Sequence, residues 1–128
     1  MVFQLSQLQP NTPYQFEVGD SKRHWGKFET LPPEGQAARF RLAFGGGAGY
    51  VPVHERMWQT IQRFEPRMLL LLGDNIYSDD PTRPEQQKYC YYRRQSRPEY
   101  RQLVQQTPVY TIWDDHDFST NDSWGGRN

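Results

Sequence analysis

The stretch MLLLLGDNIY, residues 68–77, decides the fold, because five consecutive apolar residues run directly into a glycine and an aspartate. A short, continuous apolar run is typical of a buried strand in a parallel sheet, whose two faces are both covered. We therefore expect a strand over 68–72, covered on both faces, with Asp74 placed just beyond its carboxyl end.

Similar strand patterns flank this run, namely RFRLAF at 39–44 and PVYTIW at 108–113. Between the first pattern and the apolar run, apolar residues recur at helical spacing over 52–64 until Pro66, which predicts an amphipathic helix. Strand, helix and strand in this order form a βαβ unit, in which the two strands are parallel. The expected fold class is therefore α/β, with an open sheet.

A second helical region spans roughly 84–106 and contains Pro98, which cannot lie deep inside one helix. We expect two helices there, separated near this proline. Ser96 is expected to cap the second helix, with Glu99 three residues later completing a capping box. The chain then enters the strand at 108–113.

The first 34 residues show a different pattern, of short alternating segments separated by proline and glycine. VFQLSQL (2–8), PNTPYQFEVGDS (10–21) and HWGKFETLPP (24–33) each predict a strand of an antiparallel sheet. Three short strands bury a single face only with difficulty, so we expect the end of a larger β-sandwich. The predicted division is a partial β module over 1–34 and an α/β portion over 35–128, with LPPEGQAA as the linker between them.

Composition excludes several classes of partner. The 15 lysines and arginines balance 15 aspartates and glutamates, so no net field favours nucleic acid or an anionic membrane. The longest apolar run, at 68–72, is far below the length that spans a membrane. Cys90 is the single cysteine, which excludes an intrachain disulfide and leaves a thiolate zinc site short of ligands. Nothing in the composition indicates an oligomeric state.

The loops after the three expected strands leave the same edge of the sheet, where ligands bind in open α/β folds. Two of these loops are acidic: Asp74 begins one, and the run 114–117, DDHD, begins the other. Several carboxylates that converge without a lysine repel one another unless a cation lies between them. Oxygen ligands with an imidazole suit manganese, iron, zinc, magnesium or calcium. The alternative is that each loop is a solvated turn or a helix cap.

Taken together, these motifs resemble a known family. GD-x-x-Y after an apolar strand, the stretch YCYYRRQSRPEYRQL, and V-x-x-x-WDDHD are similar to the PhoD-like alkaline phosphatases of the calcineurin-like metallophosphoesterase superfamily. The resemblance covers about residues 36–128 and implies the first half of a βαβαβ sheet that carries a dinuclear metal centre. LSQLQPNTPYQFEV resembles the late strands of a fibronectin-like module, which such enzymes often carry before the catalytic domain.

The resemblance implies a role for five residues. Asp74 would bridge two metal ions, Tyr77 would bind ferric iron as a phenolate, and Asp115 would bind the second metal. His116 would approach the leaving oxygen or the phosphoryl group, and Asp117 would orient and polarise His116. The implied cofactor is a dinuclear or multinuclear centre of iron with calcium, manganese or zinc. The implied reaction is hydrolysis of a small phosphate ester, in a secreted or periplasmic enzyme.

The sequence departs from this family in two places. Many relatives place a cysteine ligand after the first strand, where this chain has FGGGAGY at 44–50. That loop also fails the dinucleotide pattern Gly-x-Gly-x-x-Gly, because Tyr50 stands at the third glycine position. A late Gly-His-x-His element is absent, so we expect a piece of a longer phosphatase. The alternative function is a non-catalytic metal-binding or structural module.

The remaining charged residues have weaker signals. Four arginines of the second helical region either contact phosphate or form a solvated helix face: Arg93, Arg94, Arg97 and Arg101. His24 and His54 have no motif around them, so we expect both to be surface residues and not ligands.

Overall fold

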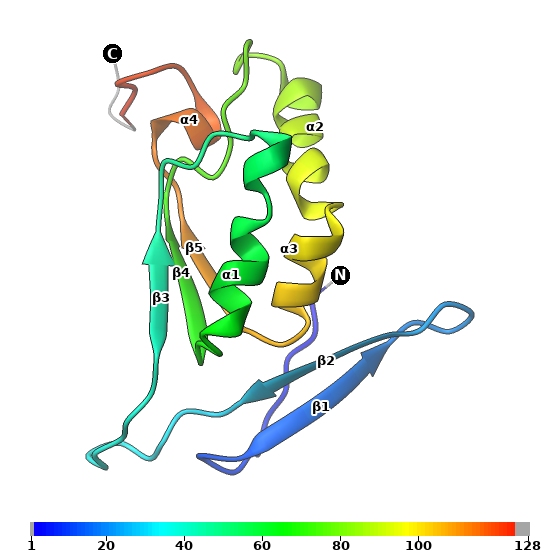
Figure 1. Ribbon diagram of the computed structural model, residues 1–128, viewed down its shortest axis with the longest axis vertical. Helices are drawn as coiled ribbons and strands as arrows, with labels where there is room; N and C mark the ends of the chain where they lie inside the picture. The colour runs from blue at the N-terminus through cyan, green and yellow to red at the C-terminus, as the bar shows by residue number, and fades with distance from the viewer. Residues whose placement is uncertain (1, 125–128) are drawn as a thin grey trace.

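The computed structural model describes residues 2–124 and contains an α/β unit and an antiparallel hairpin (Figure 1). The α/β unit has a three-stranded sheet in the order β3 (Leu42–Gly45), β4 (Met68–Leu72) and β5 (Val109–Ile112). Both pairs of neighbouring strands are parallel, so the α/β class and the βαβ connection are confirmed. No described helix is both long enough and apolar enough to cross a membrane.

Three helices cover one face of the sheet (Figure 1): α1 (Met57–Arg63), α2 (Pro84–Gln95) and α3 (Pro98–Val104). The hydrophobic core lies between α1, α3 and the sheet, and is built from Trp58, Leu69 and Leu103, which are at most 3% exposed. The Trp58 indole meets the ring of Tyr100 edge to face, with 5.0 Å between ring centroids. Helix and sheet are therefore held together mainly by apolar burial behind the central strand.

The opposite face of the sheet is not covered by the described residues 2–124, contrary to the expectation of a sheet covered on both sides. Phe44, Leu70 and Tyr110 are neighbours across the three strands on this face. Phe44 is 70% exposed and Tyr110 is 57% exposed, whereas Leu69 on the helix side is 1% exposed. Only the side of the sheet that faces the helices is therefore buried.

The predicted helix over 52–64 is interrupted. Its first turn is a separate 3₁₀-helix, η1 (Pro52–His54), and α1 begins only at Met57. The bonds between them span three residues: the N–H of Glu55 donates to the carbonyl of Pro52, and that of Trp58 to the carbonyl of Glu55. This tighter 3₁₀ geometry directs the Glu55 side chain into the interior, where it is fully buried.

The prediction that Ser96 caps the following helix is wrong. Ser96 ends α2, where its N–H donates to the carbonyl of Tyr92 and its hydroxyl to the carbonyl of Arg93. The residue before α3 is Arg97, whose backbone is extended. Because Arg97 precedes Pro98, the proline ring disfavours helical geometry there, and the helix boundary moves one residue along.

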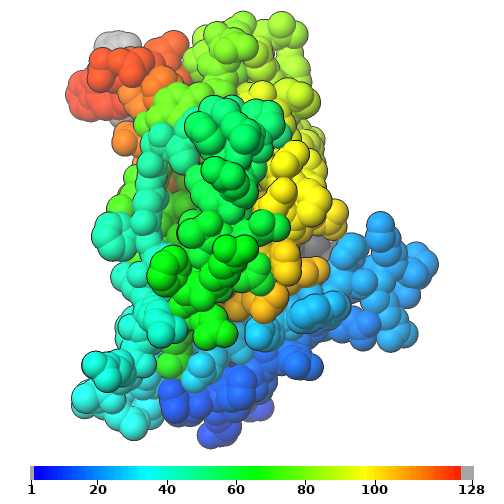
Figure 2. Space-filling view, viewed as in Figure 1, coloured from blue at the N-terminus to red at the C-terminus, as the bar shows by residue number. Residues whose placement is uncertain are grey.

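The hairpin contains two of the three predicted strands, β1 (Pro13–Val18) and β2 (His24–Glu29). Residues 2–8 form no strand, and the fibronectin-like sandwich is not confirmed. The turn between β1 and β2, in light blue, projects beyond the α/β unit (Figure 2). The base of the hairpin is attached through Arg67, which forms an ion pair of 2.9 Å with Glu29 and also donates to the carbonyl of Thr30.

Candidate metal centre

The loops after β3 and β4 approach each other backbone to backbone at the carboxyl edge of the sheet. The N–H of Gly47 donates to the carbonyl oxygen of Gly73 over 3.1 Å. A Cβ atom added to Gly46 would lie 2.9 Å from the same oxygen, which is closer than a side chain tolerates. The glycine loop of 45–49 is therefore shaped by close packing on the loop that carries Asp74.

Asp74 stands on a sharp turn directly after β4. Gly73 and Asp74 both have left-handed backbones, with φ of 98° and 50°. Aspartate tolerates this conformation better than most residues with a Cβ, yet it still carries a conformational cost. The turn directs the carboxylate to the edge of the sheet, where Oδ2 accepts a 2.9 Å hydrogen bond from the Tyr77 hydroxyl. The other oxygen, Oδ1, is buried and has no hydrogen-bond partner.

Asp115 and His116 begin α4 (Asp115–Phe118), the short helix after β5. Asp114 is its N-cap, with a capping box formed by Asp117, as the helix-cap alternative expected. Burial acts to raise the pKa of Asp115, but hydrogen bonds from the N–H groups of Asp122 and His116 and the charge of His116 outweigh it. The pKa of Asp115 therefore lies below its ordinary value, and the group is an anion at neutral pH.

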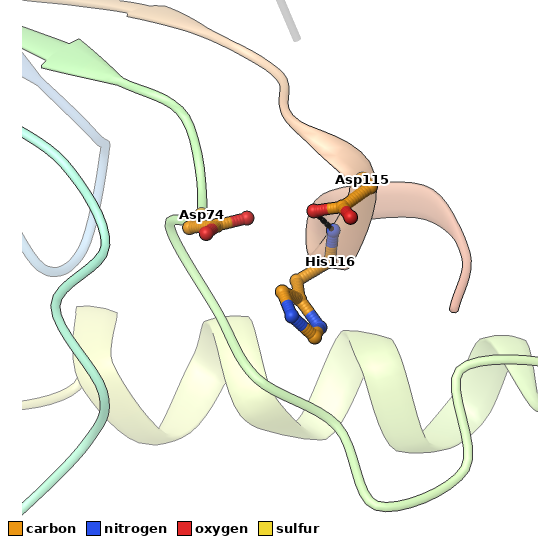
Figure 3. A group of neighbouring side chains, drawn as sticks. All are labelled: Asp74, Asp115 and His116. Atoms are coloured by element: carbon orange, nitrogen blue, oxygen red, sulfur yellow. Dashed lines mark hydrogen bonds between the residues drawn. The ribbon is translucent and has the colours of Figure 1, made fainter. Parts of the chain in front are cut away.

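These two loops bring Asp74, Asp115 and His116 together (Figure 3). One potential ligand atom from each lies within 4.8 Å of the other two. The Tyr77 ring packs on the His116 ring with 4.5 Å between centroids, which places its hydroxyl in the same cluster. Four of the five residues in the predicted site therefore meet at one point.

The donor set fits a metal ion. Burial, the hydrogen bond to Asp74 and the charges of the neighbouring carboxylates raise the pKa of Tyr77, so the potential here is negative. Within this cluster the Oδ1 atom of Asp74 is buried without a donor, and a buried carboxyl oxygen is costly when it has no partner. A cation held by carboxylate oxygens and an imidazole nitrogen would offset the negative potential and would give Oδ1 of Asp74 a partner.

Asp117, the fifth residue of the predicted site, faces away from this cluster. It is 7% exposed and accepts four hydrogen bonds, from Asn75, Tyr91 and Asp114. Burial and the bond to this carboxylate raise the pKa of Tyr91 far above its usual range, so Tyr91 is a stable donor. No hydrogen bond joins Asp117 to His116 within residues 2–124.

A buried ion pair that the sequence patterns do not predict lies behind the site. Glu55, which is 0% exposed, pairs with Arg94 across 3.0 Å and accepts a 2.8 Å bond from the Trp58 indole N–H. Arg94 also donates to the carbonyl of Asn75. The spacing that predicted the α1 helix treats Glu55 as a polar surface position, and its partner lies 39 residues away in sequence. The burial of Glu55 therefore has no local signal.

The other weak candidates fall outside the cluster. Arg94 is buried and paired, so it is not a phosphate contact, and the Arg93 guanidinium stacks 4.1 Å from the Tyr50 ring centroid. His24 and His54 are exposed, as predicted. The Cys90 thiol is buried against the carbonyl of Tyr77 and does not supply the missing cysteine ligand of the cluster.

Fold and site together define an α/β protein with an acidic, histidine-containing cluster at the carboxyl edge of a parallel sheet. Among solved structures, the "Structure of PhoD" has a TM-score of 0.76 to this chain, at 21% sequence identity. The match covers 89% of this chain and 26% of that chain, so this chain spans about a quarter of that structure. The predicted resemblance to PhoD is thus confirmed as a likeness of fold. No family model and no curated protein matches the sequence.

Proposed function

We propose that this chain is part of a metal-dependent phosphoester hydrolase of the PhoD-like kind. One observation carries the proposal: a carboxylate oxygen of Asp74 and one ligand atom each of Asp115 and His116 lie within 4.8 Å of one another at the carboxyl edge of this sheet, where Oδ1 of Asp74 is also buried without a hydrogen-bond partner. The likeness to part of the PhoD structure supports the reaction class. The resemblance of the GDNIY and WDDHD motifs to PhoD-like phosphatases points in the same direction.

In this proposal Asp74, Tyr77 and Asp115 hold the metal centre, of iron with calcium, manganese or zinc. Bound cations supply Lewis acidity and neutralise the charge that develops on the phosphoryl oxygens during hydrolysis. Asp74 would occupy the central position, because its Oδ2 atom accepts the bond from Tyr77 while its buried Oδ1 atom has no partner. The Tyr77 ring packs against the His116 ring with 4.5 Å between centroids, and His116 would donate a proton to the leaving oxygen.

The test combines metal binding with turnover of a chromogenic phosphate ester. Asp74→Asn removes the negative ligand, so we expect loss of both metal binding and turnover. Asp79→Asn is the matched control, because Asp79 is an exposed acid of the same loop with no part in the cluster. Unchanged metal binding and turnover in the Asp74 variant would refute the proposed function.

A second candidate is a non-catalytic module that binds one cation. The observation in its favour is that the described residues bring three metal-ligating side chains together, which suits one ion better than two. The two candidate functions differ in the number of metal ions bound per chain and in whether a phosphate ester is hydrolysed. One bound ion per chain without hydrolysis of any phosphate ester would favour the second.

A further inference from the structure

Asn75, the residue after Asp74, joins three elements of the site. Its backbone N–H donates to Oδ1 of Asp117 over 2.9 Å, and its side-chain amide donates to Oδ2 of Asp117 over 3.1 Å. The same amide donates to the carbonyl of Ile112, at the end of β5. Its carbonyl accepts a 2.9 Å bond from Arg94 on α2. Asn75 therefore links the loop of Asp74 to β5, to α2 and to α4, the helix that carries Asp115.

Asp117 of α4 is the acceptor for two of the Asn75 hydrogen bonds. A carboxylate offers about four lone-pair directions, and Asp117 receives four donors: two from Asn75, one from the Tyr91 hydroxyl and one from the N–H of Asp114. No acceptor direction remains for a metal ion or an imidazole. Asp74 has the opposite arrangement, with one buried oxygen that receives no donor.

We propose that Asn75 and Asp117 are positioning residues, which hold the Asp74 loop and the Asp115–His116 helix at the separation that the candidate metal centre requires. This inference rests on the proposed function, because it assigns a role relative to that centre. It gives Asp117 a different task from the polarisation of His116 that the family resemblance implies.

Asp74 and Asp115 lie on loops that follow different strands, β4 and β5, so contacts between these two loops set the distance between the two carboxyl groups. The bonds between Asn75 and Asp117 lie one residue from Asp74 and two residues from Asp115, so they hold the two backbones together beside the cluster. Tyr91 ties the same carboxylate to α2 over 2.7 Å. Outer hydrogen-bond partners of this kind typically change metal affinity by about 10- to 100-fold when they are removed.

Titration with Mn²⁺ tests the inference, with free Mn²⁺ measured by electron paramagnetic resonance. Asn75→Ala removes both side-chain bonds without changing the charge, and we expect it to weaken Mn²⁺ binding by about 10- to 100-fold. Tyr91→Phe removes one bond, again without a charge change, and should weaken binding less. Tyr92→Phe is the matched control, because Tyr92 is exposed on the same helix and makes no side-chain hydrogen bond to the site.

Amide hydrogen exchange in the absence of metal separates positioning from general destabilisation. In Asn75→Ala we expect faster exchange in the loops at 73–77 and 113–117, with unchanged exchange in α1. Mn²⁺ binding as tight as in the wild type would overturn the inference, as would a loss of protection shared equally by α1. If the wild type and Asp74→Asn both fail to bind Mn²⁺, the proposed function itself fails and this inference fails with it.

Discussion

Replacement of Arg94 by methionine should cost more stability than any surface substitution, because it leaves a buried carboxylate without its counter-ion. Glu55 is 0% exposed, and two of its three hydrogen bonds come from Arg94, at 3.0 and 3.3 Å. Only the bond from Trp58 would remain. Removing one partner of a buried ion pair costs about 3–5 kcal/mol, and methionine keeps much of the side-chain volume. We expect a loss in this range in the free energy of unfolding.

Urea denaturation followed by tryptophan fluorescence measures this loss, at an unchanged slope with denaturant. Arg83→Met is the matched control, because the side chains of Arg83 and its partner Glu85 are 60% and 67% exposed. Exposed pairs contribute about 0–1 kcal/mol, so the control should be nearly neutral. Adding Glu55→Gln to the Arg94 variant removes the stranded charge and should restore part of the loss. Equal, small losses in the Arg94 and Arg83 variants would refute the buried-pair reasoning.

Two further substitutions test the hairpin attachment and the acidic cluster. Arg67→Ala removes the charged hydrogen bonds that the Arg67 side chain makes to Glu29 and to the carbonyl of Thr30. Amide exchange in β2 should therefore become about tenfold faster or more, while exchange in β4 is unaffected. Equal protection of β2 in the variant and the wild type would contradict this. Burial acts to raise the pKa of Asp115, but hydrogen bonds to its carboxylate lower this pKa below the ordinary value of 3.8. The carboxylate therefore stabilises the folded state above about pH 4, and this stabilisation disappears as the pH falls through the pKa of the folded state. Asp115→Asn should therefore reduce the loss of stability, measured by urea denaturation, as the pH falls below about 4. An unchanged loss of stability at low pH would show that this carboxylate is not responsible.

The elements that were predicted well are those whose pattern is strong over a short distance. MLLLL at 68–72 is the observed β4 to the residue, because an unbroken apolar run has few other stable environments. Pro98 correctly separates two helices, since proline removes a donor wherever it falls. The helix over 52–64 was predicted as one piece because apolar spacing carries no information on the buried Glu55 that interrupts it.

The candidate site divides in the same way. Asp74, Asp115 and His116 could be predicted to meet, because parallel strands bring their carboxyl ends to one edge. The direction of a side chain could not be predicted. Asp117 is adjacent to His116 in sequence, yet its carboxylate points to Asn75, because the capping geometry of α4 turns it inward. Tertiary hydrogen bonds of this kind leave no trace in residue spacing.

The central claim is that Asp74, Tyr77 and Asp115 hold a metal centre beside His116 in a PhoD-like fold. Crystals of the chain grown with Mn²⁺ and measured at the manganese absorption edge test it most directly. We expect an anomalous peak within bonding distance of Oδ1 of Asp74 and of a carboxylate oxygen of Asp115, at about 2.0–2.6 Å. A well-ordered cluster without such a peak, or a peak held only by other residues, would contradict it.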